Sequence, residues 1–160
     1  MSKIVVGISD IKTSGNGEDV LITYALGSCI AVAVYDFTVK VGGLLHFMLP
    51  DSSLDPQRAK TTPAMFADTG IPLLFKSCYT LGAQKKRMKV KIAGGANILD
   101  NSNHFRIGQK NITALRKIFW RNNVLIDGED IGKDSHRTVQ LNIATGEVIV
   151  RGPNGILRKL

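Results

Sequence analysis

The side chains best suited to covalent chemistry lie in the first third of the sequence. Cys29 directly follows Gly27 and Ser28, and His46 lies near the end of the next apolar run. A thiol can attack a carbonyl carbon when an imidazole takes its proton, which is the chemistry of acyl transfer. Both runs are typical of short strands joined by a turn near residues 35–40, and a hairpin would bring the two side chains together. The pattern indicates a Cys/His acyl-transfer site.

Each of these residues also has an ordinary structural interpretation. A cysteine in an apolar strand is usually an inert small hydrophobe, and a histidine between Leu45 and Phe47 can be a core residue bonded to a backbone carbonyl. Gly27 would permit a turn closed to other residues, so that the amides of Ser28 and Cys29 could point into a pocket and stabilise an oxyanion. Ser28 itself is the weaker nucleophile, because nothing near it would activate its hydroxyl.

Composition predicts one globular domain over residues 1–160. With 44% hydrophobic and 21% charged residues, the chain can bury a sizeable core without disulfides or a structural metal. Its two cysteines, Cys29 and Cys78, are too few for a disulfide framework and lack zinc-ligand spacing, so we expect no metal and no cofactor. We find no signal peptide and no apolar run of about 20 residues, and therefore expect a cytoplasmic protein without membrane insertion.

The net charge of +8 raises the alternative of a nucleic-acid-binding domain. The densest basic run holds Lys85, Lys86, Arg87, Lys89 and Lys91. Apolar residues alternate with lysines from Met88 to Ile92, which is typical of a strand with one solvated face, although such a run can also steer an acidic partner. Aromatic residues make up only 6% and do not interleave with the basic ones, so we expect no nucleic-acid partner.

The apolar periodicity predicts an α+β fold, a layered sandwich of mostly antiparallel sheets with two main helices packed on the sheet. Strands are expected at Lys3–Ile8, Asp19–Ala25, Cys29–Tyr35, Val41–Leu49, Met88–Ala93, Val124–Ile126, Arg137–Ala144 and Glu147–Arg151. One helix should end near Gly82 and bury Cys78; because Pro72 opposes an earlier start, we expect it to begin near residues 69–71. A second helix is expected at Gln109–Asn122.

The sequence also resembles one family, the chemoreceptor glutamine deamidases called CheD. The similar residues span nearly the whole chain in order: Thr23, Gly27-Ser28-Cys29, Tyr35-Asp36, Val41-Gly42-Gly43, His46, Ala67-Asp68-Thr69, Ile71-Pro72-Leu73-Leu74, Ile92-Ala93-Gly94-Gly95-Ala96, Ile107-Gly108, Asn111, Arg137 and Ala144-Thr145-Gly146.

This resemblance implies an activity and a set of roles. Cys29 would be the nucleophile, His46 the acid-base group and Thr23, otherwise an ordinary strand residue, the third catalytic member. The reaction would convert specific glutamines of methyl-accepting chemotaxis receptors to glutamate through a thioester, with glutamyl methyl ester hydrolysis as a second activity. The resemblance also implies the CheC phosphatase as a partner. A non-catalytic adaptor that binds receptor or CheC is the alternative, and His104 and His136 are expected to be surface or structural residues.

Overall fold

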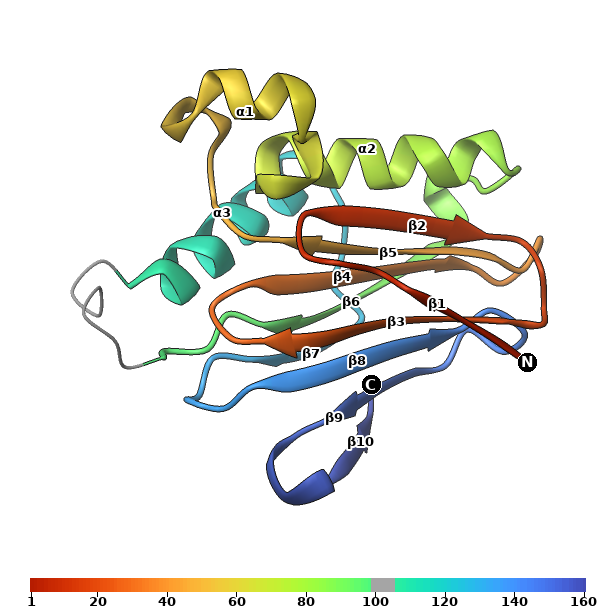
Figure 1. Cartoon of the computed structure of the whole chain (residues 1–160). Helices are drawn as coiled ribbons and strands as arrows, with labels where there is room; N and C mark the ends of the chain where they lie inside the picture. Colours follow the sequence, from red (N-terminus) through yellow and green to blue (C-terminus); the bar gives the residue numbers. More distant parts are fainter. Residues whose placement is uncertain (99–105) are drawn as a thin grey trace.

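Two five-stranded sheets pack face to face, and helices cover the outer face of one of them (Figure 1). The computed structural model describes residues 1–98 and 106–160. The strand order is β1-β3-β8-β9-β10 in the first sheet and β2-β5-β4-β6-β7 in the second. The protein therefore has three layers, helix on sheet on sheet, and the second sheet is the middle layer.

The strands are β1 (Ser2–Val5), β2 (Asp10–Ser14), β3 (Asp19–Leu26), β4 (Ile30–Asp36), β5 (Val41–Phe47), β6 (Met88–Gly94), β7 (Gly128–Ile131), β8 (Arg137–Asn142), β9 (Val148–Arg151) and β10 (Leu157–Lys159). The α-helices are α1 (Pro56–Thr61), α2 (Ala67–Thr80) and α3 (Ile107–Arg121). Short 3-10 turns lie at Ser52–Leu54, Pro63–Met65, Lys85–Arg87 and Pro153–Gly155.

Strand β4 lies at the centre of the middle layer, and its sequence shows why. All seven of its residues are buried. Ile30, Val32 and Val34 face the helices, while Ala31 and Ala33 face the first sheet. A strand covered on both faces has a continuous apolar sequence in place of an alternating one, and β4 therefore carries one face of each of the protein's two cores.

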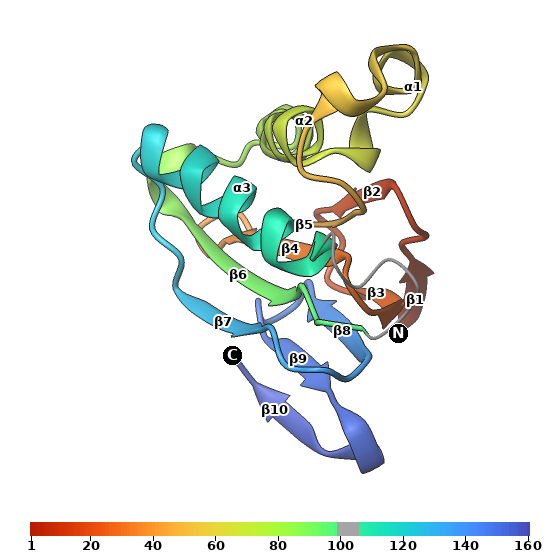
Figure 2. The ribbon, with the colours of Figure 1, turned by 90° about the vertical axis from the view of Figure 1, so that its left-hand side faces the viewer.

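The predicted fold class is confirmed. The pairs β1–β3 and β6–β7 are parallel, and the other strand pairs of the described residues are antiparallel. Helices α2 and α3 both contribute to the core on the outer face of the middle sheet (Figure 2). In the basic run, Met88, Val90 and Ile92 are buried and Lys89 is exposed, as expected of a strand with one solvated face.

The predicted start of the first long helix is wrong, because α2 begins at Ala67 and contains Pro72. Hydrogen bonds from outside the helix hold its first turn in place. The Ala67 amide donates to the Leu49 carbonyl over 2.9 Å, and the Thr69 hydroxyl donates to the Pro63 carbonyl over 2.5 Å. Pro72 removes one backbone donor from α2. The hydrogen bonds of Ala67 and Thr69 to residues outside the helix stabilise the turn that precedes it.

Further elements differ from the expectation. Of the predicted strand 124–126, Val124 and Ile126 pack against the helix-covered core without strand pairing, Leu125 is exposed, and the strand at this edge is β7, further along the chain. Strands β2 and β10 and helix α1 were not predicted, since none has a strong apolar period. In the part of the chain that the structure describes, none of the helices is long and apolar enough to span a membrane.

Candidate active site

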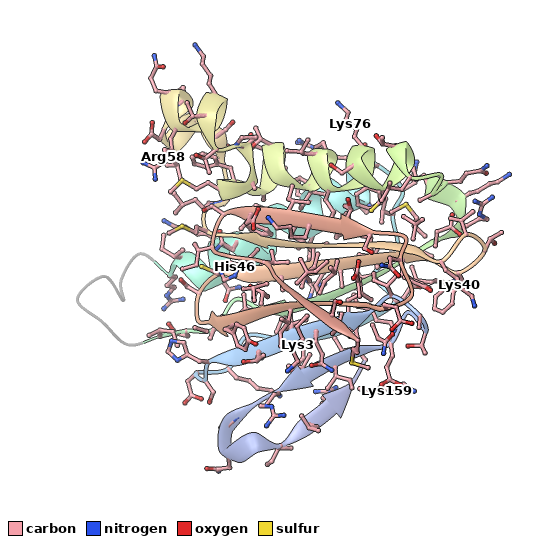
Figure 3. The ribbon with its side chains drawn as sticks, turned by 45° about the vertical axis from the view of Figure 1, so that its right-hand side comes forward. Lys3, Lys40, His46, Arg58, Lys76 and Lys159 are labelled. Carbon is pink, nitrogen blue, oxygen red and sulfur yellow. The ribbon has the colours of Figure 1, made fainter. Side chains whose placement is uncertain are left out.

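A cross-strand row in the middle sheet positions His46. Its neighbours on this row are Asp10 on β2, Ala31 on β4 and, one strand further, Ala93 on β6. Ala31 and Ala93 face the first sheet, and because opposed residues share a face, the imidazole points into the space between the sheets. His46 is 1% exposed, and Figure 3 shows it within the body of the protein, while Arg58 projects from the periphery.

Thr23 reaches the imidazole from the opposite sheet. Its Oγ1 lies 2.7 Å from Nδ1 of His46 and donates to the carbonyl oxygen of Val6 over 2.7 Å. A hydroxyl has one proton. Since the Val6 carbonyl accepts that proton, Nδ1 of His46 must be the donor to Oγ1 and carries the hydrogen. The other ring nitrogen, Nε2, is therefore the unprotonated one, and it has no hydrogen-bond partner among the described residues.

A bulge in β3 turns both Thr23 and Leu26 inward. The pairing of β3 with β8 shifts between these two residues, and both are completely buried, whereas the intervening Tyr24 and Ala25 are exposed. The left-handed backbone conformation in this segment belongs to Ala25, at φ 57°. Gly27 is not among the described residues with a left-handed backbone. A Cβ at Gly27 would lie 3.2 Å from Nε2 of His136, a tight contact that this exposed side chain would have to relieve.

Cys29 lies at the mouth of the same space. It immediately precedes β4, is half-buried, and packs at the edge of the core between the sheets that also contains Ala31. Ala31 is directly opposite His46, and Cys29 lies two residues before Ala31. Cys29 is therefore the diagonal neighbour of His46, and diagonal neighbours in an antiparallel pair are about 7–8 Å apart. The thiol and imidazole therefore share one face on adjacent strands, and no hydrogen bond joins them in this state, as the unpartnered Nε2 shows.

Burial keeps both groups neutral. Desolvation raises the pKa of the Cys29 thiol to about 11, against which its own backbone amide has a smaller lowering effect. Desolvation also lowers the pKa of His46 to about 4. At neutral pH the site therefore holds a thiol and an imidazole, and not a thiolate-imidazolium ion pair. The imidazole is available as a base over a wide range of pH.

Three successive carbonyl groups of the turn before β4 are clamped by hydrogen bonds, two of them from the segment that follows β6 and one from α3. The Gly27 carbonyl accepts from the Ala96 amide over 2.9 Å, and the Cys29 carbonyl accepts from the Gly95 amide over 2.8 Å. Between them, the Ser28 carbonyl accepts from Nδ2 of Asn111 over 2.9 Å. These contacts give a structural reason for the run at residues 92–96, to which the sequence analysis assigned no role.

Glycine is essential at one position in that run. Gly94 has φ +114°, a region that other residues rarely adopt, and a Cβ there would overlap the carbonyl oxygen of Cys29. The backbone of β6 thus passes directly against the backbone of the candidate nucleophile. The adjacent glycines in the sequence were the available signal for this close approach.

The clamps also set the direction of two amide groups. In a planar trans peptide the N–H points opposite the preceding C=O, and the described residues contain no cis peptide. With the Gly27 carbonyl held by Ala96, the Ser28 amide points away from Ala96; with the Ser28 carbonyl held by Asn111, the Cys29 amide points away from Asn111. The Ser28 amide has no acceptor within residues 1–98 and 106–160, and the Cys29 amide interacts with its own thiol. Both donors therefore lie near the sulfur.

The remaining candidates have other positions. Cys78 is completely buried on α2, as the helical spacing predicted, and desolvation raises its pKa to about 12. His136 is exposed and lies next to Gly27. His104 lies outside the described residues. Among the residues that are described, no group of three or more histidine, cysteine or acidic side chains is arranged to hold a metal ion.

Arg137 forms a second polar bridge between the sheets. It is 4% exposed, and its Nη2 donates to the Gly132 carbonyl over 2.9 Å and lies 3.4 Å from the Asp130 carboxylate. Asp130 continues the cross-strand row beyond Ala93. Since two alanines separate His46 from Asp130 along this row, Arg137 supports the sheet packing and does not contact the Thr23–His46 pair.

The fold and the site together define a small α+β protein that gathers a thiol, an imidazole and a hydroxyl at one end of its two sheets. A family model described as "CheD chemotactic sensory transduction" matches residues 48–152. This is more than half of the chain, and the chain belongs to the CheD family.

Individual relatives extend the similarity over the N-terminal region. The probable chemoreceptor glutamine deamidase CheD 1 of Syntrophus aciditrophicus is 68% identical over 160 residues, which cover 100% of both chains. The probable chemoreceptor glutamine deamidase CheD of Solibacter usitatus is 46% identical over 148 residues, covering 92% of this chain and 88% of that protein. One from Pyrococcus horikoshii is 39% identical over 153 residues, covering 94% and 93%.

Proposed function

We propose that this protein deamidates glutamine side chains of methyl-accepting chemotaxis receptors, with Cys29 as nucleophile and His46 as the acid-base group. The observation that carries the proposal is the hydrogen bond between Thr23 and Nδ1 of His46, which leaves Nε2 unprotonated and free on the face that Cys29 shares. The names of the relatives, chemoreceptor glutamine deamidases, support the substrate class.

The reaction begins with the neutral pair. The Cys29 sulfur attacks the carboxamide carbon of a glutamine while Nε2 of His46 takes the thiol proton. The tetrahedral intermediate collapses when His46 returns that proton to the nitrogen, the C–N bond breaks, and ammonia leaves a thioester. Water then attacks the thioester, with His46 taking its proton and returning it to the sulfur. The net reaction consumes water and yields glutamate and ammonia.

The Ser28 and Cys29 amides would supply the electrostatic part of this mechanism. The carbonyl oxygen of the attacked amide becomes an oxyanion beside the Cys29 sulfur. The Ser28 and Cys29 amides, which the clamps direct away from Ala96 and Asn111, would donate to it. Gly27, Ser28 and Cys29 together thus act in substrate positioning.

Substrate binding has to bring thiol and imidazole together. In the free protein the pKa values of about 11 for Cys29 and about 4 for His46 oppose ion-pair formation. Proton transfer is therefore coupled to carbon–sulfur bond formation, since a negative charge then passes to the oxyanion and its two amide donors. This requires the two side chains to approach to about 3 Å through a small rotation of the Cys29 side chain.

Glutamine side chains and glutamyl methyl esters would pass through the same acyl-enzyme. Glutamyl methyl esters would give the identical thioester with methanol as leaving group, so we include methylesterase activity in the proposal. The proposed setting is the cytoplasm, where receptor helices that carry the modified residues and the CheC phosphatase would be the partners. Figure 3 shows Lys40, Arg58 and Lys76 on separate parts of the protein.

Mass spectrometry of a purified receptor cytoplasmic fragment tests the proposal. Incubation with the wild-type protein should convert specific glutamines to glutamates and release ammonia, whereas Cys29→Ala should give neither product. Cys78→Ala serves as the matched control, because it removes the other thiol and should retain activity. Equal ammonia release by wild type and Cys29→Ala would reject the enzymatic proposal and favour an adaptor.

A further inference from the structure

Asn111 is a polar residue in an otherwise apolar position. The buried residues of α3 are Gly108, Asn111, Leu115 and Phe119, which form one stripe at helical spacing against the middle sheet. Asn111 is 0% exposed. Its Nδ2 donates two hydrogen bonds of 2.9 Å, one to the Ser28 carbonyl and one to the Met48 carbonyl. Both partners are acceptors, so the orientation of the amide is fixed.

The two carbonyls lie next to the candidate thiol and imidazole along the chain, just outside strands β4 and β5. The last paired residues of β4 and β5 at this end are Ile30 and Phe47. Ser28 and Met48 lie just beyond them, where the backbones no longer pair, and the side chain of Asn111 occupies the position of the next rung. It therefore sets how far the two strand ends separate at the mouth of the site.

Packing alone does not explain an asparagine here. Its Oδ1 is buried and has no hydrogen-bond partner among the described residues. An unsatisfied buried acceptor destabilises a fold, and an apolar residue of similar volume would avoid this penalty. The side-chain amide of Asn111 is explained instead by the two carbonyls to which it donates, those of Ser28 and Met48.

We propose that Asn111 is a positioning residue that fixes the Cys29 amide and the separation of Cys29 from His46. Because Asn111 holds the Ser28 carbonyl, it orients the peptide plane whose N–H belongs to Cys29. Because it also holds Met48, two residues after His46, it ties the imidazole's strand to the same point. The inference rests on the proposed function, since it assigns Asn111 to the same reaction.

The test compares Asn111→Ala and Asn111→Asp with two control variants. Leu115→Ala removes a buried side chain from the same stripe of α3 and controls for general destabilisation. Asn122→Ala removes an amide that also donates to a backbone carbonyl, that of Ile118, but at the exposed far end of the helix. The kcat and KM for receptor-fragment deamidation are measured for each folded variant, together with iodoacetamide alkylation rates of Cys29 and Cys78 by peptide mass spectrometry.

The expected result is opposite changes in turnover and thiol reactivity. For Asn111→Ala, kcat should fall about 10²-fold with little change in KM, as for a misplacement of reacting groups by about 1 Å. Cys29 alkylation at pH 7 should rise about tenfold, because a loosened turn exposes the thiol and lowers its pKa by about one unit. Asn111→Asp should lose at least as much activity, since a carboxylate cannot donate to two carbonyls. Cys78 should stay unreactive.

Other outcomes would overturn the assignment. A kcat within about threefold of wild type in Asn111→Ala, an unchanged Cys29 alkylation rate, or parallel labelling of Cys29 and Cys78 would each leave Asn111 a packing residue. The same changes in Leu115→Ala or Asn122→Ala would do so too. If the wild-type protein does not deamidate the fragment, the proposed function fails, while the alkylation rates still decide whether Asn111 positions the thiol.

Discussion

The hydroxyl of Thr23 joins the two sheets through the ring of His46. Its Oγ1 accepts from Nδ1 across 2.7 Å and donates to the Val6 carbonyl across 2.7 Å. This arrangement resembles the orienting carboxylate of a catalytic triad in its geometry, since the third group selects the tautomer of the imidazole. A neutral hydroxyl, however, adds no charge that would stabilise an imidazolium ion.

Replacing Thr23 by valine should lower kcat for deamidation by about 10–10²-fold, because Nδ1 of His46 would lose its acceptor and the ring its preferred tautomer. The variant should also be about 1–3 kcal/mol less stable, since the Val6 carbonyl and the imidazole would be left unpaired in the core. Steady-state kinetics and urea denaturation check both values. Thr23→Ser keeps the hydroxyl and should recover most of the activity; a valine variant as active as wild type would remove Thr23 from the mechanism.

Replacing His46 by alanine should lower kcat/KM by about 10²–10⁴-fold, the usual contribution of an acid-base group. In the wild type, kcat/KM should stay nearly constant from pH 8 to pH 5 and decline only near pH 4, because the base loses its function when it is protonated and its pKa is about 4. Rates measured across this range, with folding verified by circular dichroism, provide the check. A decline centred near pH 6.5 would contradict the buried neutral imidazole.

The buried imidazole should also make stability depend on pH. Its pKa is lowered from the model-peptide value of 6.5 to about 4 in the folded protein, so the unfolded chain binds more protons between these values. The stabilisation is complete above pH 6.5 and is lost as pH falls through this window, at up to about 1.4 kcal/mol per pH unit. Urea titrations at several pH values should show this slope in wild type. His46→Gln should flatten it, and equal slopes would argue against the assignment.

The two cysteines should separate catalysis from stability. Cys29→Ser changes one atom and should abolish deamidation while leaving the melting temperature nearly unchanged. Cys78→Ser puts a hydroxyl into the completely buried core under α2 and should reduce stability by about 1–3 kcal/mol with normal turnover at temperatures where it is folded. Thermal melts and kinetics on the pair decide the matter. The reverse pattern would make Cys78 the nucleophile.

Substituting alanine for Gly94 should impair both folding and turnover. The new Cβ would overlap the Cys29 carbonyl, and φ +114° is unfavourable for alanine. We expect a loss of at least about 1–3 kcal/mol in the free energy of unfolding and a reduced kcat in the protein that remains folded. Gly132→Ala is a useful comparison, since Gly132 has φ +75° but nothing within 4 Å of an added Cβ. Gly132→Ala should be strained without displacing Cys29.

The sequence indicated the candidate residues more readily than the contacts that surround them. Cys29 and His46 were found because a thiol after a Gly-Ser turn and a histidine in an apolar strand are local patterns. The register that makes them diagonal neighbours comes from the pairing of β4 with β5, and a hairpin can be anticipated from its two apolar runs. The layered α+β class followed from the same periodicity.

The supporting contacts were beyond local reasoning for a physical reason. The Asn111–Ser28 bond joins residues 83 positions apart, and no periodicity within a window of the sequence reports such a pair. The bulge in β3 was not predicted, because glycine is the residue that usually takes left-handed conformations, whereas here Ala25 adopts one between the inward-facing Thr23 and Leu26. A polar residue on the apolar stripe of α3 was the one usable sign of the clamp.

The protonated state of Cys29 bears on how the protein withstands oxidants. Hydrogen peroxide reacts with thiolates far faster than with thiols. At pH 7, a pKa of about 11 leaves about one Cys29 in 10⁴ ionised. The desolvated surroundings of Cys29 should therefore protect the sulfur from conversion to sulfenic acid, and the protein should retain its titratable thiol in cells whose respiration or surroundings generate peroxide.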